Sequence, residues 1–254
     1  MDKRIGAQLY TVRDLCQDLD GFKKTMKRIA DIGYKTVQLS GINCTEDAEV
    51  LKSAFEENGL QVVATHRPFA NFADNIEGEI AFHKTLGCKV AGVGGFGLAM
   101  RDSIEKTRET VKKCNEIHER LKAEGMSFGW HNHGAEFARL DDGKTSVMDI
   151  ILEEGNFDLI LDAYWIAYVG IDPARFIKKV GERASILHLK DMRVLPDNKV
   201  EYAEIGEGNI LWNEVLEAAE KSKFAVIEQD ICHRDPVDCL ETSYKYLTSN
   251  FDLN

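Results

Sequence analysis

The segment 130–136 (WHNHGAE) concentrates side chains that can bind a metal ion or carry a proton: two imidazoles, an amide and a carboxylate. It follows an apolar, strand-like run. Because alternate residues of a strand face opposite sides, His131 and His133 share one face and the bulky Trp130 lies on the other. The pattern predicts a strand buried on both faces, with a polar cavity at its carboxyl end. The structural alternative is a pair of hydrogen-bonded core histidines beside a surface glutamate.

Short apolar runs alternate with longer amphipathic runs along the whole chain, and glycines such as Gly33, Gly59 and Gly87 follow the amphipathic ones. The expected strands are 5–12, 36–39, 61–65, 89–93, 127–133, 157–161, 185–189 and 224–227, and the expected helices are 19–32, 45–58, 74–86, 102–123, 146–154, 173–180, 211–219 and 236–247. A series of strand–helix units within 254 residues predicts an α/β fold, a single (β/α)8 TIM barrel forming one domain over residues 1–254.

Active sites of such barrels collect at the carboxyl ends of the strands. The polar residues expected there are Tyr10, Arg13, Gln38, His66, His131, His133, Glu136, Asp162, His188, Lys190, Asp191, Glu228 and Asp230. Carboxylates and imidazoles gathered at one end of so many strands need charge compensation, and a bound cation supplies it at the lowest cost. We therefore expect a metal site.

Composition limits the partners and the compartment. The net charge of -11 disfavours nucleic acid as a partner, because nucleic-acid binding relies on lysine and arginine to neutralise phosphates. No run reaches the roughly 18 apolar residues of a membrane span. Six cysteines without a CxxC pair, and an amino-terminal segment without a signal-peptide pattern, predict reduced thiols in the cytoplasm. A homo-oligomer is possible.

Several segments carry a family resemblance: 8–13 (QLYTVR), 33–34 (GY), 37–39 (VQL), 130–133 (WHNH), 136–137 (EF), 161–162 (LD), 188–191 (HLKD), 206–208 (GEG) and 227–230 (IEQD). Together they resemble the sugar phosphate isomerase/epimerase superfamily of xylose isomerase-like TIM barrels. The resemblance covers essentially the whole chain. The HLKD segment with the later ExD is fairly specific, and the other segments are weak singly.

Members of this superfamily bind one divalent metal ion through a Glu, an Asp, a His and a Glu from strands five to eight. The resemblance implies Asp162, His188 and Glu228 as the last three ligands. At strand five it places His131 where the family has its glutamate. Either His131 is the ligand, or the backbone bends and Glu136 supplies the carboxylate; we favour Glu136 because it preserves proton transfer. A mixed oxygen and nitrogen ligand set suits Mn, Mg, Co or Zn.

A hydroxy-ketone bound to such a metal has its α-proton acidified. With Glu136 and Glu228 on either side, one is expected to remove this proton and the other to return it. Lys190 is expected to polarise a substrate oxygen or protonate a leaving hydroxyl group, with a surface lysine as the alternative. The expected substrate contacts, through hydroxyl groups or a phosphate, are His66, Arg67, His133 and Trp165.

The favoured function is a metal-dependent isomerase or epimerase that acts on a keto-sugar or related polyol. A lyase or dehydratase acting on a keto-sugar, keto-glycoside or inosose shares the proton abstraction and is the main alternative. An abasic-site endonuclease is disfavoured because the resemblance then implies three zinc ions and further histidines, whereas Gly94 and Gly95 stand at strand four. A non-catalytic sugar-binding relative is the remaining class. The acidic net charge favours a neutral small-molecule carbohydrate.

Overall fold

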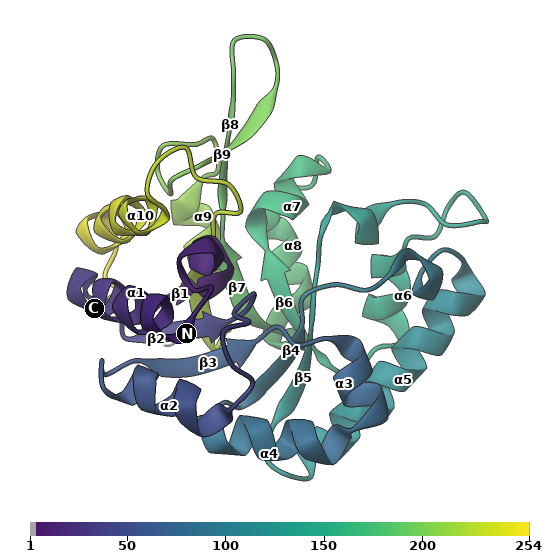
Figure 1. Cartoon of the computed structure of the whole chain (residues 1–254). Coiled ribbons are helices and arrows are strands. Elements are labelled where there is room, and N and C mark those ends of the chain that lie inside the picture. The colour runs from purple at the N-terminus through teal and green to yellow at the C-terminus, as the bar shows by residue number, and fades with distance from the viewer. Residues whose placement is uncertain (1–3, 254) are drawn as a thin grey trace.

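The computed structural model describes residues 4–253, and its parallel strands close into a barrel surrounded by helices (Figure 1). Neighbouring strands follow the order β1, β10, β7, β6, β5, β4, β3 and β2, and β2 pairs with β1 to close the barrel. The strands are β1 (Ile5–Gln8), β2 (Thr36–Leu39), β3 (Gln61–Thr65), β4 (Val90–Val93), β5 (Ser127–His131), β6 (Asp158–Asp162), β7 (Ala184–Leu189) and β10 (Phe224–Ile227). The predicted (β/α)8 TIM barrel is confirmed.

Helices form the outer layer, and the last one, α10, lies beside α1 (Figure 1). The helices are α1 (Leu19–Ile32), α2 (Ala48–Glu56), α3 (Phe69–Asp74), α4 (Ile76–Leu86), α5 (Ile104–Lys122), α6 (Val147–Glu154), α7 (Ala163–Tyr168), α8 (Pro173–Val180), α9 (Trp212–Ala218) and α10 (Pro236–Asn250). Short 3₁₀ helices are η1 (Leu9–Leu15), η2 (Leu98–Met100), η3 (Gly134–Phe137) and η4 (Gly181–Arg183). Across residues 4–253, every helix is too short or too polar to cross a membrane.

Apolar side chains pack in two separate regions. The larger core lies between the strands and the helices and includes Phe128 and Trp130, the outward residues of β5. A smaller cluster fills the barrel interior: Val63, Ala64, Val90, Ile160, Ile186 and Val226. Gly92 on β4 is required here, because a Cβ would lie 2.5 Å from the backbone oxygen of Thr65 as well as from Ile160 Cδ1. The interior is thus packed with aliphatic side chains, and polar groups occupy the carboxyl ends of the strands.

Some boundaries differ from those expected. The strand expected over 5–12 ends at Gln8, and η1 begins at the next residue, Leu9. The Gln8 side chain caps η1 by accepting a hydrogen bond from the Tyr10 amide. The strand expected over 127–133 ends at His131. Helix α7 and the hairpin β8 (Asp191–Val194) and β9 (Val200–Ala203) were not expected. The hairpin projects beyond the end of the barrel (Figure 1).

Candidate metal centre and substrate cavity

Four buried side chains at the carboxyl ends of adjacent strands form a group that could hold a metal ion: His131, Asp162, His188 and Glu228. Each offers one ligand atom, and these atoms all lie within 4.8 Å of one another. The strand register explains the convergence, because Asp162 on β6 pairs directly with His188 on β7, and His188 pairs with Val226 on β10. A second possible group replaces the carboxylates with His66.

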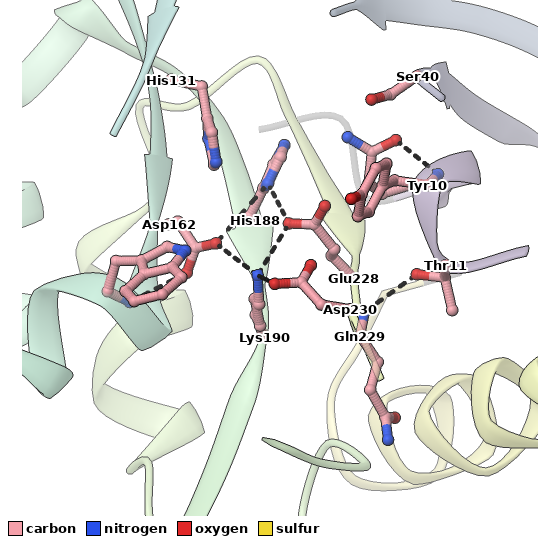
Figure 2. A network of polar contacts seen from close by, with 12 residues as sticks. Tyr10, Thr11, Ser40, His131, Asp162, His188, Lys190, Glu228, Gln229 and Asp230 are labelled. Carbon is pink, nitrogen blue, oxygen red and sulfur yellow. Dashed lines mark hydrogen bonds and ion pairs between the residues drawn. The ribbon is translucent and has the colours of Figure 1, made fainter. Parts of the chain in front are cut away.

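His188 lies between the carboxylates and an amide. Its Nδ1 is 2.9 Å from Glu228 Oε2 and 4.0 Å from Asp162 Oδ2 (Figure 2). Its Nε2 donates to Gln38 Oε1 at 2.7 Å, and Gln38 is fully buried on β2. Because that oxygen can only accept, Gln38 fixes the proton on Nε2 and directs Nδ1 towards the carboxylates. This is the arrangement of a metal-binding histidine whose other nitrogen is held by the protein.

Lys190 is the cation of the cluster. Its Nζ donates to Asp230 Oδ2 at 2.7 Å and lies 3.6 Å from both Asp162 Oδ2 and Glu228 Oε2 (Figure 2). Burial alone would lower the pKa of Lys190, but Glu228, Asp162 and Asp230 raise it. Burial raises the pKa of Glu228, and the positive charges of Lys190 and His188 more than offset this, so its pKa is lowered. The cluster therefore contains one firmly held ammonium group and an ionised Glu228.

The donor set fits a divalent cation. Asp162 Oδ2 is buried and has no hydrogen-bond partner among the described residues, although its Oδ1 accepts from the Trp165 amide at 3.2 Å. Burial raises the pKa of Asp162 to about 7, and Lys190 opposes this shift. A buried carboxylate oxygen without a donor is costly unless a cation compensates it. A metal ion bound by His188 Nδ1 would displace the proton on that nitrogen, as metal binding generally does.

At strand five the structure brings His131, and not Glu136, into this group. His131 Nδ1 donates to the backbone oxygen of Ile160 at 3.3 Å, which leaves Nε2 as the ligand atom. The Glu136 carboxylate instead accepts from the His133 amide at 2.7 Å and lies 3.6 Å from Arg101. Glu136 occupies the third position of η3, where it caps the backbone, and this local bond turns it away from the cluster.

A cavity of about 260 Å³ opens over the group. Of the metal-capable side chains, His131 and Glu228 line it, whereas Asp162 and His188 are fully buried. The other lining residues are Tyr10, Ser40, His66, Gly94, His133, Trp165, Lys190 and Asp230. The structure thus brings three of the four expected substrate contacts, His66, His133 and Trp165, to one cavity.

Arg67, the fourth expected contact, does not line this cavity. Its guanidinium pairs with Glu79 at 2.9 Å and with Glu46 at 2.6 Å, and it lies over the Phe82 ring. Glu79 lies on α4 and Glu46 lies just before α2, both in the outer layer of helices. The guanidinium group therefore points away from the barrel axis.

Gln38 was expected at the end of its strand without an assigned role, and it contacts His188. Residues outside the predicted set also contribute: Gln8 ends β1, Ser40 follows β2, and both contact His66. Asn132 Oδ1 accepts the backbone amide of Asp162 at 3.0 Å and holds β6 beside β5. The position of these residues near strand ends was the one sequence signal for a role in the site. Because their side chains are uncharged, there was no reason in the sequence to choose them as site residues.

Comparison with known proteins agrees with the barrel fold. Residues 26–247 match the family model described as the xylose isomerase-like TIM barrel. An inosose dehydratase of Clostridium perfringens is 20% identical over 271 residues, covering 91% of each chain. A solved sugar phosphate isomerase/epimerase from Parabacteroides distasonis superposes with a TM-score of 0.84 at 19% identity, covering 100% of this chain and 96% of that one. A probable 3-DHS dehydratase from Bacillus anthracis gives a TM-score of 0.73 at 14% identity, covering 97% and 99%.

Proposed function

The chain belongs to the xylose isomerase-like TIM-barrel family, and from this premise we propose a divalent-metal-dependent enzyme that removes the proton next to the carbonyl group of a keto-sugar or cyclic keto-polyol. The observation that carries the proposal is the buried group of two carboxylates and two imidazoles beneath a cavity of about 260 Å³. Its residues are His131, Asp162, His188 and Glu228.

Each residue has a distinct part in this chemistry. A divalent ion held by the four side chains would supply Lewis-acid polarisation of the substrate oxygens. Glu228 lines the cavity, and its carboxylate accepts the α-proton. Lys190 lies beside it and stabilises negative charge that develops on the substrate oxygen. Gln38 holds His188, and Asp230 holds Lys190, so neither group must reorient during the reaction.

Among the finer alternatives we favour a lyase that removes water. Epimerisation by two carboxylates needs one on each face of the substrate, and the Glu136 carboxylate is bound to the His133 amide instead. Elimination needs only one: Glu228 takes the α-proton and delivers it to the leaving β-hydroxyl group, so that a C–H and a C–O bond break, a C=C bond forms, and water departs. The resemblance to an inosose dehydratase supports this choice.

The test is to incubate the metal-loaded enzyme with ketohexoses and inososes in deuterated buffer and to follow the products by mass spectrometry. Loss of water is the expected result. Deuterium incorporation without loss of water would instead assign an isomerase or epimerase at the same site. If neither occurs with any of these substrates while metal is bound, proton abstraction is refuted. Glu228→Gln is the matched control, because its amide cannot accept the proton.

A further inference from the structure

The formal charges of the cluster balance when one divalent ion is bound. Asp162, Glu228 and Asp230 contribute three carboxylates, and Lys190 contributes one ammonium group within 3.6 Å of all three. A divalent ion cancels the remaining negative charges. No positive charge is then left over to pair with a phosphate or carboxylate group of a ligand, which would be buried there without compensation.

Other cations near the barrel end are engaged elsewhere. Lys190 is the only lysine or arginine among the described residues that line the cavity. Arg67 pairs with Glu79 and Glu46, and Arg101 donates to the Phe96 carbonyl. Arg13 lies 4.0 Å from the centre of the Tyr10 ring and donates to backbone carbonyls. The cavity therefore lacks the cationic clamp that recognises phosphate.

The free donors that the cavity does offer are uncharged, and Trp165 supplies the first. Its Nε1 is buried and has no hydrogen-bond partner within residues 4–253. The indole group donates and cannot accept. It lines the cavity, so an oxygen of a bound ligand is the partner that it lacks.

His66 supplies the second. Gln8 Oε1 accepts from the Tyr10 amide, so Gln8 Nε2 is the atom that faces His66 Nδ1 at 3.4 Å. Nδ1 must then accept, and the ring proton resides on Nε2, which is buried without a partner among the described residues. Because Nε2 carries this proton, His66 acts as a donor to the cavity and not as a metal ligand.

We propose that this cavity selects an uncharged, unphosphorylated single-ring keto-polyol, and that His66 Nε2 and Trp165 Nε1 donate to its hydroxyl or carbonyl oxygens. The inference rests on the proposed function and specifies its substrate. A volume of about 260 Å³ suits one ring, since pockets for larger, drug-sized ligands span roughly 300–1,000 Å³. Trp165 and His66 are thus specificity-determining residues.

Binding, not turnover, tests this inference, so that its failure is distinct from failure of the proposed reaction. The metal-loaded protein is titrated calorimetrically with D-fructose, D-glucose and myo-inositol, and with a monophosphate ester of each. We expect at least one neutral polyol to bind at least about tenfold more tightly than its ester. Equal or tighter binding of the esters, or no binding by any neutral polyol, overturns the inference.

Two tryptophan variants test the donor. Trp165→Phe keeps an aromatic ring and should weaken binding of the neutral polyol about tenfold, the upper range for one lost hydrogen bond, while metal content is unchanged. Trp130→Phe is the control, since Trp130 is a buried tryptophan whose ring stacks on Phe96 and does not line the cavity. Equal polyol affinity in Trp165→Phe and the parent, or equal losses in both variants, contradicts the role of Trp165.

Discussion

Replacing His131 with phenylalanine tests which strand-five residue binds the metal. The ring centre of His131 lies 4.5 Å from that of His188 and 4.8 Å from that of His66, so a phenyl ring keeps most of this packing. It removes the ligand nitrogen Nε2 and also the 3.3 Å hydrogen bond from Nδ1 to the Ile160 carbonyl. If four ligands share a binding free energy of roughly 10–16 kcal/mol, each contributes about 2.5–4 kcal/mol. Metal affinity should therefore fall about 100- to 1,000-fold.

Glu136→Gln is the matched control. The amide oxygen still accepts from the His133 backbone, which the carboxylate accepts at 2.7 Å, and no metal ligand is lost. Its metal affinity should stay within about twofold of the parent, a change that corresponds to less than 0.5 kcal/mol. Both variants are measured by calorimetric titration with Mn²⁺ and Zn²⁺ and by elemental analysis after dialysis, and circular dichroism checks the fold. Metal loss in Glu136→Gln with retention in His131→Phe would refute the assignment.

Three further outcomes are expected. Gln38→Leu should weaken metal binding about 10- to 100-fold because His188 loses its hydrogen-bond partner. Gln38→Glu keeps an acceptor oxygen, so this variant should bind the metal more tightly than Gln38→Leu. Equal metal affinities of the two variants by calorimetry would count against the role of Gln38. Lys190→Met leaves three carboxylates together and should destabilise the metal-free protein by about 3–5 kcal/mol. Adding Mn²⁺ should recover part of this stability. An unchanged midpoint of urea unfolding without metal would be inconsistent with the stabilising role of Lys190. Hydrogen bonds from Thr145 and the Lys144 amide lower the pKa of Asp142 to about 2, so its stabilisation is present above the unfolded pKa and is lost as pH falls through about 2. Asp142→Asn should accordingly lower Tm near neutral pH, by a difference that narrows below pH 4, and a difference independent of pH would contradict this account.

The barrel and most of its site follow from local sequence patterns. Apolar runs of strand length alternate with amphipathic runs, and few arrangements other than a parallel barrel bury both. Once the strands are placed, their carboxyl ends must meet, which brings Asp162, His188 and Glu228 together without knowledge of the loops. The alternation of β5 likewise places Trp130 outward and His131 inward, as the structure shows.

The position of Glu136 could not be derived in the same way, because the four-residue 3₁₀ helix η3 decides it. Beyond His131 the chain leaves strand geometry and forms η3, so the period of two no longer predicts direction. The spacing of His133 and Glu136 is that of a capping box, in which a carboxylate reaches back to a backbone amide three residues earlier. That local signal competed with the resemblance-based expectation of a metal ligand, and the structure shows the cap formed.

Helix α7 and the β8–β9 hairpin were missed for different reasons. The segment 163–168 is almost wholly apolar and therefore has no helical periodicity, although Asp162 caps it through the Trp165 amide. The hairpin turn contains Pro196 and Asn198, and the positive φ of 65° at Asn198 is typical of a turn asparagine. Its strands are four residues each, DMRV and VEYA, so the polar and apolar alternation is too short to predict them.

The segment 188–191 combines a chemical and a structural task through strand alternation. His188 and Lys190 face the cluster, and Asp191 faces the opposite side. There its two oxygens accept from Trp212 Nε1 at 2.7 Å and from three backbone amides, of Met192, Gly206 and Ile210. These bonds hold the loops after β7 and β9 against α9, and they fix the backbone on which Lys190 is mounted. The Asp191 carboxylate therefore serves to position Lys190, since Asp191 belongs neither to the metal-capable group nor to the cavity lining.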